Sequence, residues 1–162
     1  MRVLDLFSGI GGFAYAGHLL GGFTTLDFVE IDPYCQQILR KNFPNVPIHD
    51  DITTFDTSFR FGEYDLITAG FPCQDLSSAG KQAGLGAGTR SGLFYRVMQI
   101  ARQVRPKFIL LENVANTISH NKGQTFQQIL HEIAQSGYNA EWGIVSAADV
   151  GACHLRKRIW II

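Results

Sequence analysis

The stretch that decides the fold is "RVLDLFSGIGGFA", residues 2–14. Its first six residues are mostly apolar and predict a buried strand over 2–7. The glycine turn "SGIGG" follows, and helical apolar spacing runs from Phe13 to about Leu20. Glycines at such a turn permit a tight bend and let a ligand approach the backbone closely. This stretch therefore predicts that an α/β fold begins with a strand, a ligand-binding turn and a helix.

This turn carries a pattern that narrows the ligand. Gly9 to Ala14 fits G-x-G-x-x-G/A, and Glu30 lies about 20 residues further on, at the end of the next expected strand. A carboxylate in that place can accept hydrogen bonds from both hydroxyls of a ribose. The residues indicate a nucleoside-bearing cofactor, either a dinucleotide or S-adenosylmethionine, the alternative being glycines that merely make a turn. Asp51 is a candidate acceptor for an adenine amino group, although aspartates cap turns in many proteins.

The rest of the chain alternates strands with helices. Strands are expected at 24–31, 64–71, 107–114, 139–150 and 156–162, with a short element near 46–49, and helices at 34–43, 93–105 and 123–137. This alternation predicts one α/β domain over residues 1–162, built on a doubly wound, mostly parallel sheet. Ligands bind outside the carboxyl ends of the strands in such sheets. The polar residues that end the strands are therefore expected along one edge: Ser8–Gly12, Glu30, Asp51, Cys73 and Glu112.

Composition excludes several classes of protein. Apolar residues make up 46% and charged residues 17%, which is typical of a globular protein and not of a disordered one. No apolar run approaches the roughly 20 residues that cross a bilayer, and the first residues lack a secretory signal, so a cytoplasmic protein without a membrane partner is expected. The three cysteines are far apart and form no C-x-x-C pair, which predicts neither a metal site nor a disulfide framework.

The net charge of zero hides an asymmetry along the chain. Residues 1–65 hold four Lys/Arg against nine carboxylates, whereas residues 66–162 hold ten against five. Between Asp75 and Glu112 there are six basic residues and no acid. A polyanionic partner for the second part would account for this split, and a solvated helix face together with chance is the alternative.

The segment "GFPCQ" at 70–74 raises the question of what Cys73 does. Most isolated cysteines are small buried hydrophobes, which is the interpretation for Cys35 and Cys153. Cys73 differs because it follows Pro72 at a strand end, opens a glycine-rich loop of about 20 residues, and has basic residues downstream that would favour a thiolate. Glu112 ends the neighbouring strand, and a buried carboxyl there would be a candidate proton donor; the alternative is that it caps the following turn.

In order, six motifs carry a family resemblance: "DLFSGIGGF" at 5–13, "EID" at 30–32, "DDIT" at 50–53, "GFPCQDLSSAG" at 70–80, "ENV" at 112–114 and "RKR" at 156–158. With them, the sequence resembles the DNA (cytosine-5)-methyltransferases over essentially its whole length. The resemblance implies a Rossmann-like fold of the S-adenosylmethionine-dependent methyltransferase type. It also implies methylation of C5 of cytosine in double-stranded DNA, in a bacterial or phage-encoded restriction–modification setting.

The resemblance assigns a role to each matching residue. Cys73 would attack C6 of a cytosine flipped out of the duplex, Glu112 would protonate or hydrogen-bond N3, and Arg156 and Arg158 would neighbour the base and its phosphate, with Arg158 on the cytosine O2. Asn113 would support the nucleophile loop. The expected cofactor-binding residues are Phe7, Ser8, Gly9, Gly11, Glu30, Ile31, Asp51, Ile52 and Pro72. The loop from Gln74 to Gly92 would close as a lid, with Ser77, Lys81 and Arg90 contacting DNA.

Two departures from the family pattern stand out. The family's Q-x-R-x-R begins here with His154 in place of glutamine, which adds pH dependence to that hydrogen-bonding position. The sequence also ends at Ile162, directly after this motif, whereas family members continue into a target recognition domain. We therefore expect weak or no activity on DNA from the chain alone, and a complementary C-terminal fragment or subunit as a partner.

Two other functions compete with the methyltransferase. A nicotinamide-dependent oxidoreductase would use the glycine turn and Glu30, but it gives "PCQ" and "ENV" no role. An inactive remnant that still binds S-adenosylmethionine would use the same fold without the chemistry. The intact Cys73 and Glu112 argue against a remnant.

Overall fold

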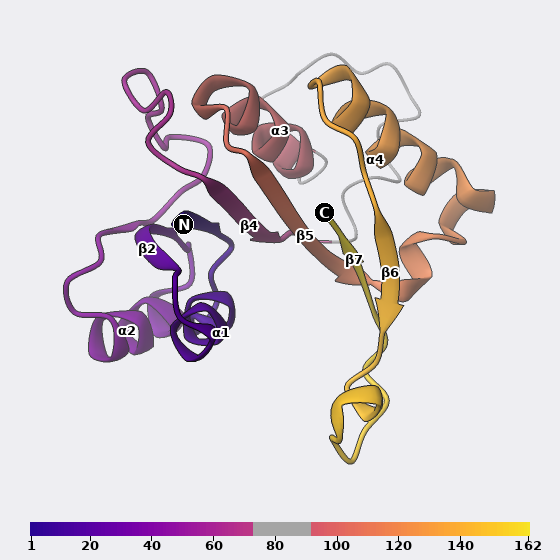
Figure 1. Ribbon diagram of the computed structural model, residues 1–162, viewed down its shortest axis with the longest axis horizontal. Helices are drawn as coiled ribbons and strands as arrows, with labels where there is room; N and C mark the ends of the chain where they lie inside the picture. Colours follow the sequence, from indigo (N-terminus) through magenta and orange to yellow (C-terminus); the bar gives the residue numbers. More distant parts are fainter. Residues whose placement is uncertain (73–91) are drawn as a thin grey trace. The chain divides into compact units, whose positions relative to one another are not determined.

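The computed structural model describes residues 1–72 and 92–162. The strands in this part are β1 (Arg2–Leu6), β2 (Thr24–Val29), β3 (Ile48–His49), β4 (Leu66–Gly70), β5 (Phe108–Val114), β6 (Trp142–Val145) and β7 (Arg158–Ile161). Its α-helices are α1 (Gly12–Leu20), α2 (Pro33–Asn42), α3 (Gly92–Val104) and α4 (Gln124–Gln135). Figure 1 shows them along the chain. The strand order is β3-β2-β1-β4-β5-β7-β6. Every strand and helix expected from the sequence is present within these residues.

The sheet is mixed. β1 pairs in parallel with β2 and β4, and β2 pairs in parallel with β3. β7, in contrast, runs antiparallel to both β5 and β6. The α/β alternation predicted the parallel part correctly, because each of those strands is followed by a crossover. Pairing of the last two strands depends on a hairpin, which the alternation does not reveal.

The chain divides into two compact units. The first consists of residues 1–70 and 99–110, and the second of residues 71–98 and 111–162. In the first unit, Phe28 and Leu39 are fully buried with Ala14, and Phe43, Val46 and Ile48 pack against them. This core joins α1 and α2 to β2. Since it lies beside the glycine turn, it also fixes the start of α1.

Local chemistry sets the start of α2 as the sequence predicts. The side chain of Asp32 accepts hydrogen bonds from the backbone N–H groups of Tyr34 and Cys35, and Pro33 occupies the first turn. An aspartate cap satisfies donors that the first helical turn leaves unpaired, and proline has no donor to lose there. α2 therefore begins directly after Glu30 and Ile31, two of the expected site residues.

The second unit is built around β5, β7 and α4. Leu111, Ile159 and Ile161 alternate inward along the two strands, and Ile129 and Ile133 of α4 are also buried. The ring of Phe126 meets that of Trp142 edge-on, with centroids 5.3 Å apart. These contacts fix the antiparallel register in which Asn113 faces Ile159 and Val114 faces Arg158.

The expected strand at 139–150 is wrong in length. β6 covers only Trp142–Val145 and is followed by the 3-10 turn η4 (Ala148–Val150). The reason is a local pair of hydrogen bonds: Ser146 N donates to Asp149 Oδ2 at 2.8 Å, and Asp149 N donates to Ser146 Oγ at 3.2 Å. Such side-chain bonds compete with a strand ladder and turn the chain. The 3-10 turns η2 (Ala115–Thr117) and η3 (His120–Gly123) were not predicted.

In the described ranges, no helix has both the length and the apolar character needed to span a bilayer.

Candidate functional site

The glycine turn and Glu30 form a cradle in the first unit. Gly9 N donates to Glu30 Oε2 at 2.7 Å, and Asp32 N donates to Glu30 Oε1 at 2.8 Å. The carboxylate thus has a fixed direction and is 9% exposed as a residue. Each carboxylate oxygen can accept more than one hydrogen bond, so this clamp leaves capacity for ligand hydroxyls. The predicted pairing of the turn with the acid at the end of β2 is present.

Gly9 and Gly11 serve different purposes within this cradle. Both have positive φ, 54° and 91°, which strains any other residue. A Cβ added to Gly11 would lie 2.7 Å from Phe43 Cε2, so this glycine is required by packing. A Cβ on Gly9 would meet no described atom within 4 Å. Open space at Gly9 is what close approach of a ligand to the backbone requires.

Ser8 is held inside the unit. Its side chain donates to the carbonyl oxygen of Asp5 at 2.7 Å, and its N–H donates to the carbonyl oxygen of Val29 at 3.2 Å. The hydroxyl therefore ties the turn to β1 and is less suited to a ligand than the sequence suggested. Its expected contact with the cofactor remains a prediction.

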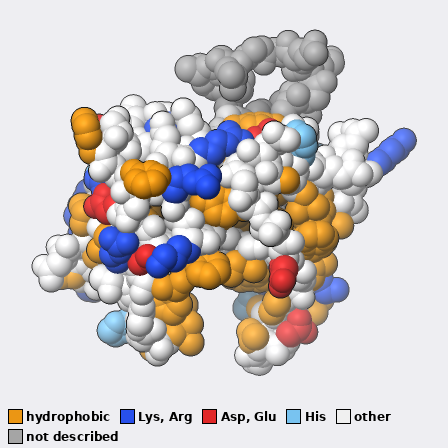
Figure 2. Space-filling model, turned by 45° about the horizontal axis from the view of Figure 1, so that its top comes forward, with side chains coloured by type: hydrophobic (Ala, Val, Ile, Leu, Met, Phe, Trp, Pro, Cys, Tyr) orange, Lys and Arg blue, Asp and Glu red, His pale blue; other side chains and the backbone are white. Residues whose placement is uncertain are grey.

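Two of the expected cofactor-binding residues, Phe7 and Ile31, lie next to the cradle. Phe7 has φ 55°, an unusual conformation for a bulky residue, directly after β1. Backbone strain of this kind is concentrated at functional sites. Large apolar side chains reach the surface of the molecule (Figure 2), and Ile10 and Ile31 beside the cradle are 58% and 71% exposed. Exposed apolar side chains beside a carboxylate of fixed orientation are suited to binding a planar nucleoside base.

Asp51 begins a turn after β3. Its Oδ1 accepts from Thr53 N and from Thr53 Oγ1, both at 2.8 Å. These two bonds fix the carboxylate in the manner of an Asx turn. Ile52 is 5% exposed and anchors the turn in the core, so its expected cofactor contact is less accessible than that of Ile31.

A buried carboxyl that the sequence analysis did not single out lies under the turn. Asp5 is fully buried on β1, accepts a hydrogen bond from Thr68 Oγ1 at 2.6 Å, and its Oδ2 has no hydrogen-bond partner within the described residues. Burial raises the pKa of Asp5 to about 7; the Thr68 bond opposes the rise and nearby Glu30 adds to it. The sequence signal that could have identified Asp5 is an acidic residue within a mostly apolar strand.

The second unit brings Glu112 and Arg158 together. Arg158 Nε lies 2.7 Å from Glu112 Oε1, and the two side chains are 22% and 23% exposed. Glu112 is on β5 and Arg158 on β7, and the antiparallel register places them on the same face. Glu112 is therefore partly exposed and ion-paired, and is not the buried carboxyl that the proton-donor interpretation considered. The pairing itself was not predicted, because 46 residues separate the partners.

Asn113, which was expected to support the nucleophile loop, binds the backbone just before that loop. It is 4% exposed, and its Nδ2 donates to the carbonyl oxygen of Phe71 at 3.1 Å. Its Oδ1 accepts from Val114 N at 2.8 Å and from Thr117 Oγ1 at 3.3 Å. The amide thus binds the backbone of the segment that continues through the exposed Pro72 to Cys73. Cys73, Ser77, Lys81 and Arg90 lie outside the described residues.

The arginine motif begins in a loop with a strained residue and ends at the start of β7. Arg156 is exposed with φ 34°, and Arg158 Nη1 donates to the carbonyl oxygen of Lys157 at 3.0 Å. His154 is exposed in the same loop. Exposed cations on a defined loop suit contacts with phosphate. Over residues 1–72 and 92–162, no three His, Cys, Asp or Glu side chains form a group that would hold a metal ion.

Comparisons with known proteins agree with these features. A family model described as C-5 cytosine-specific DNA methylase matches residues 1–162. The type II methyltransferase M1.ScrFI of Lactococcus lactis subsp. cremoris is 37% identical over 161 residues, which are 99% of this chain and 41% of that protein. The type II methyltransferase M.HpaII of Haemophilus parainfluenzae is 40% identical over 162 residues, which are 98% of this chain and 44% of that protein.

A solved structure shows the same fold. The Dnmt2 methyltransferase of S. pombe superposes with a TM-score of 0.78 at 26% identity, over 99% of this chain and 50% of that chain. This match confirms the predicted Rossmann-like methyltransferase fold. The chain spans half or less of the length of these relatives.

Proposed function

The chain belongs to the C-5 cytosine-specific DNA methylase family, as its motifs predicted, and from this premise we propose that it transfers a methyl group from S-adenosylmethionine to C5 of cytosine in DNA. The relatives that match are longer, with the matched part covering 41% to 44% of two of them. We therefore also propose that turnover on DNA needs sequence of the kind those relatives carry outside the matched part.

The cradle of the first unit fits the cofactor. Glu30, fixed by two backbone donors, would accept the ribose hydroxyls, and the backbone at Gly9 borders open space. Phe7 and Ile31 would contact the adenine ring, and the fixed carboxylate of Asp51 would accept from its amino group. When bound, the cofactor supplies the electrophilic methyl group. The residues present hold its nucleoside by shape and by hydrogen bonds.

The second unit supplies groups for the chemistry on the base. Cytosine C5 is a weak nucleophile, so the thiolate of Cys73 would first bond to C6 of a flipped-out cytosine. Glu112 would protonate N3, which takes up the electron pair that the attack displaces through the ring and leaves C5 electron-rich. C5 would then take the methyl group as S-adenosylhomocysteine leaves. A base would remove the C5 proton, the thiolate would leave C6 as the C5–C6 double bond re-forms, and N3 would return its proton to Glu112. The ring ends methylated and the sulfur ends as it began.

The Glu112–Arg158 pair suits the base-binding step. Arg158 donates to Glu112 in the absence of a base and would hold the carboxyl toward the ring edge while its remaining donors reach the cytosine O2. Arg156 and the loop residues Ser77, Lys81 and Arg90 would contact the DNA backbone. Phosphate contacts position the duplex without reading its sequence.

One observation carries the proposal. Asn113, next to Glu112 at the end of β5, binds the carbonyl oxygen of Phe71, two residues before Cys73 in the sequence. The residue next to the proposed proton donor thus binds, through a buried amide, the segment that leads to the proposed nucleophile. A cysteine with a merely structural role would need no such link to the acid.

Covalent trapping tests the proposal. The chain, combined with the part that a longer relative carries outside the matched residues, is incubated with S-adenosylmethionine and a DNA duplex that contains 5-fluorocytosine, from which the reaction cannot remove the C5 substituent. We expect a complex that survives denaturing electrophoresis and is lost in Cys73→Ser, with Cys153→Ser as the matched control that retains it. If Cys73→Ser forms the adduct as well as the unchanged chain does, the mechanism is wrong. Cofactor binding without any adduct from this combination would favour an inactive binding module.

A further inference from the structure

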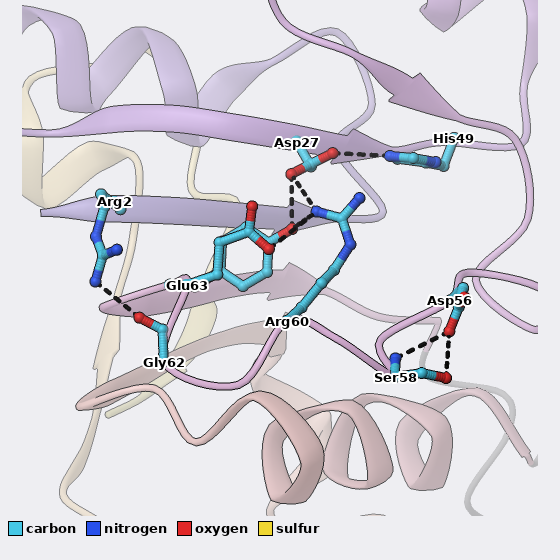
Figure 3. A network of polar contacts seen from close by, with 9 residues as sticks. Arg2, Asp27, His49, Asp56, Ser58, Arg60, Gly62 and Glu63 are labelled. Carbon is cyan, nitrogen blue, oxygen red and sulfur yellow. Dashed lines mark hydrogen bonds and ion pairs between the residues drawn. The ribbon is translucent and has the colours of Figure 1, made fainter.

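A polar network that the proposed chemistry does not use surrounds one buried carboxylate of the first unit (Figure 3). Asp27, on β2, is 3% exposed. Its Oδ1 lies 2.8 Å from His49 Nε2, and its Oδ2 accepts from Arg60 Nη1 at 3.0 Å and from the Tyr64 hydroxyl at 2.6 Å. Arg60 also donates to the Tyr64 hydroxyl. Asp27 is thus fully satisfied by three side chains that follow it in the sequence.

These three side chains come from both ends of one segment. His49 is the last residue of β3, and Arg60 and Tyr64 precede β4. Phe55 lies between them: its ring meets that of His49 edge-on with centroids 4.7 Å apart, and the Arg60 guanidinium lies 5.1 Å from its centroid. The Asp27 carboxylate therefore joins the two ends of the segment 49–64, and the ring of Phe55 packs between the side chains that bind it.

Asp51 lies inside this segment. It follows His49 by two residues, and β3, which leads to it, consists of only two residues at the edge of the sheet. Backbone bonds at the two ends of β3 run from Phe28 N to Pro47 O and from Glu30 N to His49 O, both 2.9 Å. β3 is a short edge strand, and the side-chain bond from His49 to Asp27 adds a restraint two residues before Asp51.

We propose that Asp27, through His49, is a positioning residue that places the carboxylate of Asp51 where it reads the amino group of the cofactor's adenine. This inference rests on the proposed function, because it assigns a task to a residue of the proposed cofactor site. Asp27 lies on β2, and Glu30 directly follows this strand, three residues after Asp27. β2 thus orients the ribose acceptor directly and the adenine acceptor indirectly.

A role in stability alone makes a different prediction. If the network only held the loop in place, its loss would lower the unfolding temperature and weaken all ligands equally. A positioning role is specific for one ligand group. Loss of this role should weaken the binding of S-adenosylhomocysteine, which has the amino group. The binding of S-inosylhomocysteine, which has a carbonyl in that place, should not change.

Calorimetry with these two ligands tests the inference on the chain itself. A hydrogen bond to a charged group is worth about tenfold to a hundredfold in affinity, so the unchanged chain should prefer the adenosyl ligand by that factor. Asp51→Ala should abolish the preference. His49→Ala should reduce it to about threefold or less. His49→Gln should restore it, because its amide nitrogen replaces Nε2. Asp65→Asn breaks the exposed pairs with Arg2 and Lys107 in the same unit and should leave the preference unchanged.

The outcomes separate the two levels of the argument. If the unchanged chain binds neither ligand, the proposed function fails. If it prefers the adenosyl ligand and Asp51→Ala removes that preference while His49→Ala keeps it, the positioning role is wrong although the cofactor site stands. Equal weakening of both ligands in His49→Ala also overturns it. Should His49→Ala not fold, His49→Phe keeps a ring beside Phe55 and removes the nitrogen that bonds Asp27, and a preference unchanged in that variant overturns the inference.

Discussion

The two units hold their proposed site residues in different ways. In the first, Glu30 is clamped by backbone N–H groups at 2.7 and 2.8 Å, and Asp51 by its own turn. In the second, Glu112 is held by a side chain, Arg158, at 2.7 Å. Backbone donors are part of the fold and do not leave when a ligand arrives. A side-chain partner can exchange its bond for one with the substrate.

This contrast fits the two tasks that we propose. Binding the same cofactor in every cycle requires a preformed cradle, which reduces the ordering cost of binding. Receiving a flipped base requires groups that remain satisfied until the base enters. The partly exposed Glu112–Arg158 pair meets that requirement, because neither charge is left alone in the absence of a base. The contrast predicts that substitutions in the two units separate into effects on chemistry and effects on binding.

Glu112→Gln should have the largest effect on the chemistry. It removes the proton donor while keeping the shape, and general acid catalysis contributes about 100-fold to 10,000-fold. We expect the rate of adduct formation with 5-fluorocytosine DNA, measured on the chain combined with the part that a longer relative carries outside the matched residues, to fall by at least about 100-fold. Glu141→Gln, an exposed glutamate of the same unit, is the matched control and should react at the original rate. A rate that Glu112→Gln leaves unchanged would contradict the role of this carboxyl.

Asp5 gives the first unit a pH dependence of stability. Its folded pKa of about 7 lies above the unfolded value of about 3.9, so between these values the folded state holds a proton that the unfolded state has lost. Stability from this group therefore falls as pH rises through the window, by about 1.4 kcal/mol per pH unit. Asp5→Asn removes this titration. The free energy of unfolding of the variant, minus that of the unchanged chain, should therefore rise from about pH 5 to pH 7. Urea unfolding of both proteins measures this, and parallel curves would contradict it.

Gly11→Ala and Gly9→Ala separate packing from strain within the cradle. Gly11→Ala meets Phe43 Cε2 at 2.7 Å and also strains φ, so we expect a loss of about 2–3 kcal/mol. Gly9→Ala meets no described atom within 4 Å and carries the strain alone, about 1–2 kcal/mol. Thermal unfolding gives the stabilities. The order should reverse in cofactor affinity, where the methyl group at Gly9 obstructs the ligand; equal affinities for both variants would place the ligand elsewhere.

Local sequence signals predicted the first unit well. The turn at 8–12, the Asp32 cap and the pairing of the turn with Glu30 all depend on residues close in sequence or on one parallel crossover. Such features are set by backbone chemistry, which a single sequence reveals. The Asp27 network was not predicted, because an acid in a strand does not show which later side chains will reach it.

The second unit shows where sequence reasoning ends. The motifs gave Glu112, Asn113 and Arg158 roles, but the ion pair depends on β7 running antiparallel to β5. That register follows from packing in the core, and the expected strand over 139–150 was too long because a Ser146–Asp149 turn ends it. Non-local pairing is decided by the whole fold, so side-chain partners across strands are the part a single sequence conceals.

The most direct test of the account is one substitution made in both units. Binding of S-adenosylhomocysteine is measured by calorimetry for Glu30→Gln and for Glu112→Gln, which change the same group in the same way. We predict that Glu30→Gln weakens binding by about tenfold or more, the worth of a hydrogen bond to a charged acceptor, while Glu112→Gln leaves it within about twofold. Equal weakening by both, or weakening by Glu112→Gln alone, would contradict the assignment of the cofactor to the first unit.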